Sequence, residues 1–109
     1  IALDNGALNN ERENDKIDKK RVWWVEAESV VGFINAYQHS GEKKFLESAR
    51  SVWEYIKAEM IDKREGSEWY AEVSYDHKPH DWKEIVGPWK CPYHNGRMCM
   101  EVINRGVDF

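Results

Sequence analysis

Between residues 22 and 39, apolar side chains recur every three or four positions, which is the spacing of one face of an α-helix. This stripe consists of Trp23, Ala27, Val30, Ile34 and Tyr37. A second apolar stripe begins at Trp24, directly beside the first, so most of the helix surface is apolar. We therefore expect a helix over 22–39 that is buried on several sides.

A second helix is predicted over 43–61, and it has one apolar and one charged side. The apolar side carries Phe45, Ala49, Val52, Trp53, Ile56 and Met60. Gly41 stands between the two helices, where a glycine can adopt the left-handed conformation that ends a helix. The two predicted helices therefore form a helical hairpin, with the first element nearly all buried and the second half exposed.

Three further elements follow from local patterns. Pro92 suits the first turn of a helix that we expect over 92–104. Alternating apolar and polar residues predict a strand over 69–75. Asn14-Asp15 can turn a short hairpin with flanks near 7–11 and 16–19, although a solvated loop fits equally well. The pattern predicts a mainly α fold with a short β-hairpin or strands in the connecting loops.

The composition is that of a folded domain: 41% of the 109 residues are hydrophobic and 33% are charged. The net charge is −4, and the basic residues are interspersed with acidic ones, so we expect no nucleic-acid or membrane partner. Two cysteines and no visible signal peptide favour a cytoplasmic location. Because the chain opens on Ile1 rather than methionine, we expect it to be a piece of a longer protein.

The densest group of aromatic and polar side chains is the stretch 87–97, which reads GPWKCPYHNGR. His94 falls in the first turn of the expected helix, with Arg97 on the same face. A helix N-terminus and a nearby cation favour a neutral imidazole, which can accept a proton and later donate it. A structural histidine that bonds a carbonyl fits equally well. The other histidines are expected to be solvated: His39, His77 and His80.

Glu28 lies four residues after Trp24 and shares its helix face. Its carboxylate either interacts favourably with the positive end of the helix dipole or is a buried group that faces a polar cavity. The six tryptophans fill a core or offer faces to sugars. Cys91 and Cys99 flank His94, but they are two helical turns apart and lack the second ligand pair of a structural zinc site, so we expect no metal.

Four segments together carry a family resemblance: WWVEAE at 23–28, the hairpin around Gly41, WEYI at 53–56 and GPWKCPYHNGR at 87–97. Together they resemble the C-terminal part of N-acylglucosamine 2-epimerase-type enzymes. The resemblance implies an (α/α)6 barrel, in which 22–39 and 92–104 are inner helices and 43–61 is an outer one. Residues 1–109 would then be the C-terminal segment of a single catalytic domain, monomeric when complete, with the N-terminal part of the barrel as its necessary partner.

The resemblance also implies a reaction: epimerisation at C2 of the reducing-end glucose of β-1,4-linked disaccharides. Cellobiose would become glucosyl-mannose, and lactose would become epilactose. The ring opens, a base removes the C2 proton, and the enediolate is reprotonated on the other face, with no cofactor. Two alternatives remain within the family, N-acylglucosamine 2-epimerase and aldose–ketose isomerase. A third is a non-catalytic, helical sugar-binding module.

Residue by residue, the resemblance assigns His94 as one of two catalytic histidines; the other lies outside this chain. Glu28 matches an essential carboxylate that binds a sugar hydroxyl or orients His94. The remaining matches are substrate-binding candidates, namely Trp23, Trp24, Trp89 and, less directly, Arg97. Trp53 is expected to stay in the core because it lies on the apolar face of its helix.

Overall fold

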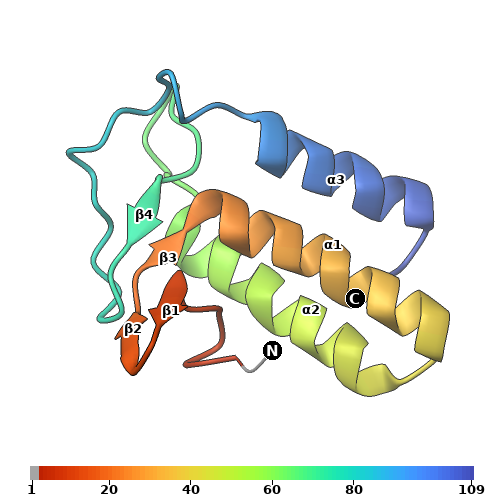
Figure 1. Ribbon diagram of the computed structural model, residues 1–109. Helices are drawn as coiled ribbons and strands as arrows, with labels where there is room; N and C mark the ends of the chain where they lie inside the picture. Colours follow the sequence, from red (N-terminus) through yellow and green to blue (C-terminus); the bar gives the residue numbers. More distant parts are fainter. Residues whose placement is uncertain (1–2) are drawn as a thin grey trace.

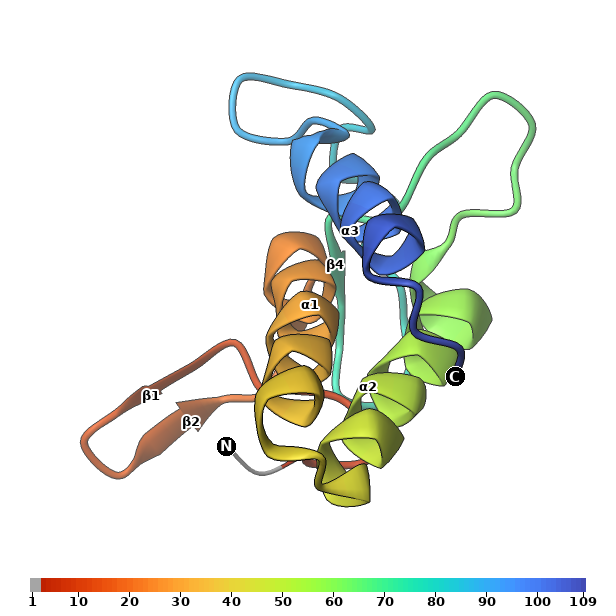
Figure 2. The ribbon, with the colours of Figure 1, turned by 90° about the vertical axis from the view of Figure 1, so that its right-hand side faces the viewer.

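The computed structural model describes residues 3–109; Ile1 and Ala2, at which the chain opens, lie outside the described residues. Three helices dominate the fold, and the first packs against both others (Figures 1 and 2). They are α1 (Trp23–Ser40), α2 (Lys43–Tyr55) and α3 (Tyr93–Arg105). The predicted helices over 22–39 and 92–104 are confirmed to within one residue at each end, and so is the mainly α fold.

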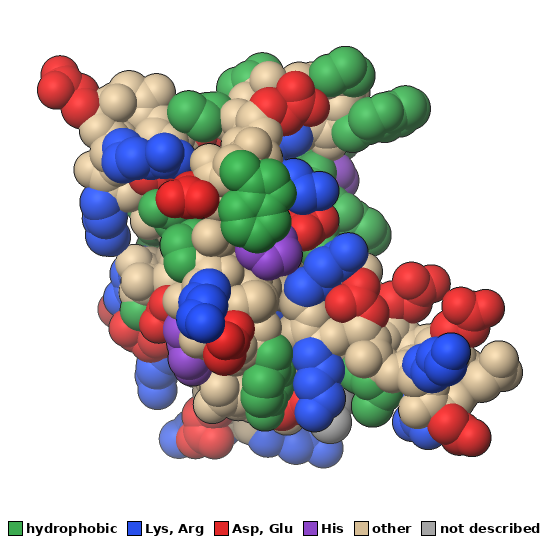
Figure 3. Space-filling view, turned by 90° about the vertical axis from the view of Figure 1, so that its left-hand side faces the viewer, with side chains coloured by type: hydrophobic (Ala, Val, Ile, Leu, Met, Phe, Trp, Pro, Cys, Tyr) green, Lys and Arg blue, Asp and Glu red, His purple; other side chains and the backbone are tan. Residues whose placement is uncertain are grey.

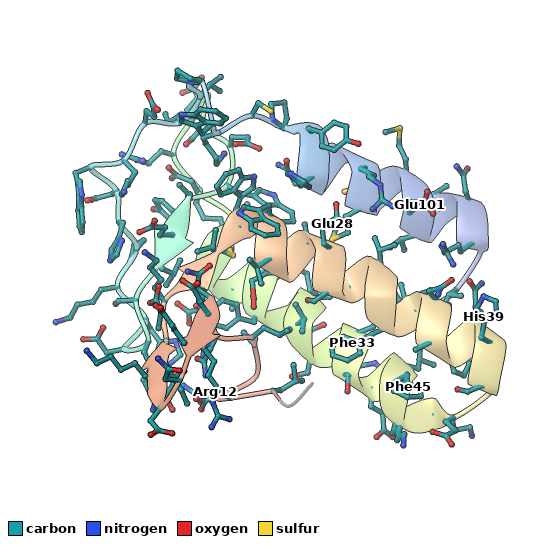
Figure 4. All side chains as sticks on the ribbon, in the orientation of Figure 1. Arg12, Glu28, Phe33, His39, Phe45 and Glu101 are labelled. Carbon is teal, nitrogen blue, oxygen red and sulfur yellow. The ribbon has the colours of Figure 1, made fainter. Side chains whose placement is uncertain are left out.

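The hairpin between α1 and α2 is confirmed as well. Gly41 has φ 72°, in the left-handed region, and its N–H donates to the carbonyl of Tyr37 over 2.8 Å. This bond satisfies one of the carbonyls left free at a helix end. The turn brings α2 back along α1, so that Phe33 and Phe45 lie along the seam between the two helices (Figure 4).

The predicted helix over 43–61 is continuous, but its last part is wider than an α-helix. α2 passes directly into a π-helical turn, η1 (Ile56–Met60), which ends with the N–H of Ile61 donating to the carbonyl of Ile56 over 3.0 Å. Ile56 and Met60 are fully buried, so this turn completes the apolar side of the helix. Trp53 packs against the same core, as expected.

The short hairpin near the N-terminus forms as a pair of strands. β1 (Glu11–Glu13) pairs antiparallel with β2 (Lys16–Asp18), and the turn between them is Asn14-Asp15. Asn14 has φ 54°, a conformation that asparagine tolerates better than most residues. The hairpin extends away from the helices, and its strand residues are mostly exposed (Figure 2).

The strand expected over 69–75 is wrong in its extent. In the described part of the chain only Glu72–Val73 forms a strand there, β4, which pairs antiparallel with β3 (Arg21–Val22). β4 is short because its partner β3 has two residues before the chain turns into α1. Elsewhere in the segment, Trp69 makes a single bridge to Ile61. The short pairing still ties the segment to the start of α1.

Two buried charged residues anchor the N-terminal segment to the start of α1. Arg21 is 1% exposed and donates to Asn9 Oδ1 over 2.6 Å and to the carbonyl of Asp4. Glu26 is fully buried and accepts a bond of 2.6 Å from the N–H of Leu8. Burial raises the pKa of Glu26 to about 7, against the opposing effects of that bond and of Arg21.

The strands and connecting loops gather at the end of the molecule where α1 and α3 begin (Figure 1). Figure 3 looks onto this end, where hydrophobic side chains and histidines lie among charges of both signs. His39 lies at the opposite end of α1 and is exposed, as expected (Figure 4). His77 is also exposed, with Nε2 3.3 Å from Asn5 and Nδ1 3.4 Å from Glu59.

The expectation of a solvated His80 is wrong. Its side chain is 20% exposed, and Nδ1 donates to the carboxylate of Glu72 over 2.9 Å. Its ring stacks on Trp82 with centroids 4.4 Å apart. The polar loop 76–83 indicated solvent, but the loop folds back over β4 and supplies His80 with a carboxylate partner.

Candidate active site

His94 and Glu28 form a direct pair between α3 and α1. Nδ1 of His94 donates to Oε1 of Glu28 over 2.9 Å, and Nη1 of Arg97 donates to Oε2 of the same carboxylate over 2.7 Å. The side chains of His94 and Glu28 are each 33% exposed, and that of Arg97 is 37% exposed. One carboxylate is therefore shared by an imidazole and a guanidinium. It fixes the proton of His94 on Nδ1, leaving Nε2 as the ring nitrogen that can accept a proton.

Local structure explains how these side chains meet. Pro92, with φ −76°, precedes the first residue of α3, so His94 and Arg97 stand in its first two turns on one face. Glu28 stands in the second turn of α1, and Figure 4 shows it in the space between α1 and α3. Because both helices begin at the same end of the molecule, their first turns lie side by side.

Aromatic rings surround the imidazole. The ring centroid of Trp24 lies 5.8 Å from that of His94, and those of Trp23 and Tyr93 lie at 6.4 and 5.0 Å, both edge-on. Trp24 is 44% exposed and Tyr93 is 63% exposed, so these faces are open to a ligand. Flat, partly exposed aromatic faces suit the C–H faces of a sugar ring.

An open cleft of about 540 Å³ lies beside these rings. It is of the size that small-molecule sites have. Trp89, which is 89% exposed, reaches it from the loop before α3. The lining residues are Asn10, Lys20, Val22, Trp23, Trp24, Glu72, Trp89 and His94.

The structure thus brings together the residues that the sequence singled out, in two groups. His94 and the three tryptophans line the cleft. Glu28 and Arg97 are not among the lining residues; they bind each other, and Glu28 also accepts from Nδ1 of His94. The geometry favours the second alternative for Glu28, which is to orient His94.

Sequence reasoning missed three polar residues of the cleft, namely Asn10, Lys20 and Glu72. Lys20 lies 3.8 Å from the carboxylate of Glu72, which also binds His80. No motif marks these positions. For Lys20 a signal was available in the sequence. Lys20 directly precedes β3, and β3 runs into α1, so Lys20 stands close to the start of α1, where Trp23 lies.

Cys91 and Cys99 are free and exposed. Within residues 3–109, no three side chains of the metal-ligating types come together. None of the helices in this described part is both long and apolar enough to span a bilayer. That the protein uses no metal and no cofactor stays a prediction.

Comparison with known proteins shows to which family the chain is related. Residues 2–96 match the family described as N-acylglucosamine 2-epimerase (GlcNAc 2-epimerase). A cellobiose 2-epimerase of Ruminococcus albus is 78% identical over 99% of this chain, and one of Dictyoglomus turgidum is 50% identical over 95%. The crystal structure of a sugar epimerase from a ruminal bacterium superposes with a TM-score of 0.96 at 77% identity, and the match covers the whole chain and 28% of that structure.

The chain therefore belongs to the N-acylglucosamine 2-epimerase family. It spans 28% of the length of the Ruminococcus relative and 26% of the Dictyoglomus one. The three helices of the described residues are a fragment of the (α/α)6 barrel of that family, as the resemblance implied. The assignment of α1 and α3 as inner helices stays a prediction.

Proposed function

We propose that this chain is the C-terminal segment of a carbohydrate 2-epimerase that inverts C2 of the reducing-end glucose in β-1,4-linked disaccharides. The observation that carries the proposal is the 2.9 Å contact between Glu28 and His94 at the edge of a tryptophan-lined cleft. The relatives named cellobiose 2-epimerase support the substrate class.

The reaction needs a group that moves one proton at carbon. After ring opening, the aldehyde at C1 acidifies the C2–H bond. Nε2 of His94 is suited to exchange this proton: when it accepts, the electron pair of the C–H bond becomes part of the enediolate, and when it donates, that pair forms the new C–H bond. The two half-reactions balance without an oxidant or a reductant.

Inversion also needs a second acid–base group on the opposite face of C2, because one histidine reaches one face. In this proposal that group comes from the preceding part of the barrel. The carboxylate of Glu28 stabilises the imidazolium that forms transiently on His94 and keeps the ring from turning. Arg97 neutralises Glu28 on its other oxygen. Trp24 and Trp89 stack against the sugar rings, and Trp23 forms the edge of the cleft beside His94.

The test is an exchange experiment with the longer protein that contains this segment. Cellobiose is incubated with the protein in D2O, and products are followed by NMR and chromatography. The proposal predicts glucosyl-mannose with deuterium at C2, and a loss of about 100-fold or more in kcat for His94→Asn. His39→Asn is the matched control, because His39 is exposed at the far end of α1. Epimerisation at the wild-type rate in His94→Asn would contradict the assignment.

A substrate panel separates the alternatives. Turnover of N-acetylglucosamine in place of cellobiose identifies an N-acylglucosamine 2-epimerase, and conversion of mannose to fructose identifies an aldose–ketose isomerase. Sugar binding without deuterium at C2 identifies a non-catalytic module. We expect cellobiose and lactose to be turned over with the highest kcat/KM of the panel.

A further inference from the structure

Glu68 is a carboxylate outside the cleft that binds two buried donors near His94. Its Oε2 accepts from Nζ of Lys90, and its Oε1 accepts from Nδ2 of Asn95. Lys90 is 3% exposed and Asn95 is 7% exposed. Lys90 makes one further bond, of 3.2 Å, to the carbonyl of Ile85. Glu68 itself comes from the segment between η1 and β4, far from both partners in the sequence.

The two partners of Glu68 stand on either side of His94. Lys90 stands four residues before His94, outside α3, and Asn95 follows His94 directly in the first turn of α3. Glu68 therefore holds the chain at both edges of the residue that lines the cleft. The same Lys90 ammonium lies 5.4 Å from the ring centroid of Trp23, which meets His94 edge-on.

A buried ammonium is unfavourable without an anionic partner, and Glu68 is the carboxylate that Lys90 contacts. If that charge is removed, Lys90 must move toward water, and the loop before α3 moves with it. Displacing a proton-transfer group by about 1 Å can lower a rate by about 100-fold. The start of α3 is thus held by side-chain contacts from another segment, in addition to its own backbone bonds.

We propose that Glu68 is a positioning residue, which sets the placement of His94 by binding Lys90 and Asn95. The inference rests on the proposed epimerase function. Glu68 is not among the residues that line the cleft, so it acts through its partners and does not meet the sugar. Its loss should therefore lower kcat while leaving KM nearly unchanged.

The test compares Glu68→Gln, Glu68→Asp and Glu65→Gln in the longer protein, far below the melting temperature of each variant. Glu65 lies in the same segment between η1 and β4 but is exposed, which makes it the matched control. We expect Glu68→Gln to lower kcat at least about tenfold with KM changed by less than about threefold. Glu68→Asp should recover part of kcat because it keeps the charge. The proposal is overturned if Glu68→Gln has the wild-type kcat. It is also overturned if the loss of kcat is no larger than the fraction of the variant that is unfolded under the assay conditions.

A second measurement is independent of turnover. Diethylpyrocarbonate modifies accessible imidazoles, and mass spectrometry of the peptide that contains His94 gives the rate at that residue. We expect the rate at His94 to rise in Glu68→Gln and to stay at the wild-type value in Glu65→Gln. An unchanged rate in Glu68→Gln overturns the proposal whatever the kinetics. If the wild-type protein epimerises no sugar, the proposed function fails, and this rate alone decides the role of Glu68.

Discussion

The carboxylate of Glu28 lies 2.9 Å from Nδ1 of His94, although the two residues are 66 positions apart in the sequence. The contact joins the second turn of α1 to the first turn of α3. It converts a histidine at a helix start into one whose proton position and orientation are set by a carboxylate. The same carboxylate holds Arg97, so its negative charge is partly balanced before any substrate binds.

Glu28→Gln should lower kcat by about 100-fold, because a neutral amide stabilises the imidazolium less than a carboxylate does. KM should change little, since Glu28 does not line the cleft. Steady-state kinetics with cellobiose measure both constants. The control is Glu101→Gln, which removes a carboxylate of α3 that binds Arg105 over 3.0 Å and stands seven residues after His94, further along the helix (Figure 4 labels Glu101). Equal kcat values for the two variants would contradict the role given to Glu28.

Trp89→Ala should raise KM while leaving the melting temperature at the wild-type value. Trp89 is 89% exposed, so little apolar burial is lost, but a stacking face for the sugar disappears. A loss of about 1 kcal/mol in binding corresponds to a rise of about fivefold in KM. Trp82→Ala is the control, because Trp82 lies in the same loop and stacks on His80 instead of lining the cleft. A rise of equal size in the control would show that the loop, and not the stacking face, matters.

The free energy of unfolding should depend on pH through Glu26. Burial raises its pKa from 4.5 to about 7, so between these values the folded protein keeps a proton that the unfolded chain has lost. The contribution is fully present below pH 4.5 and is lost as pH rises to about 7, a change of about 3 kcal/mol. In Glu26→Gln, which can still accept the N–H of Leu8, this part of the pH dependence should disappear.

Urea denaturation of wild type and Glu26→Gln at pH 5, 6, 7 and 8, the span that brackets a pKa of about 7, measures the difference. The variant should be the more stable protein at pH 8. Glu47→Gln, at an exposed position of α2, should follow the wild-type curve. Parallel curves for wild type and Glu26→Gln would exclude a buried, titrating Glu26.

Gly41→Ala should lower the free energy of unfolding by about 1 kcal/mol, because φ 72° costs an alanine about that much. Gly41→Asn should cost less, since asparagine adopts left-handed backbone more readily. Thermal denaturation of the wild type, Gly41→Ala and Gly41→Asn gives their order of stability. KM should stay unchanged in both variants because the turn follows Ser40, at the end of α1 opposite β3 (Figure 1), whereas Trp23 and Trp24, which line the cleft, stand at its beginning. Equal melting temperatures for Gly41→Ala and the wild-type protein would refute the argument that the left-handed backbone at residue 41 requires glycine.

Several features of the candidate site could not be predicted from local patterns. The strand over 69–75 shortened to β4 because its partner β3 has two residues. His80 lies within a polar loop, but this loop folds back over Glu72 and leaves the His80 side chain 20% exposed. Glu68 carries no signature in its own segment, since its importance comes from Lys90 and Asn95. Each case depends on a partner that lies outside the local pattern of its own segment.

The sequence by itself determined where the helices lie and which sides of them are apolar, because helical periodicity and end signals such as Gly41 are local. The family resemblance named the candidate site residues before any contact was known. Only the tertiary structure decided that Glu28 holds His94 and that Glu68 holds the chain around it. These are contacts between helices and loops, and their geometry follows from how α1 and α3 pack, which no local pattern encodes.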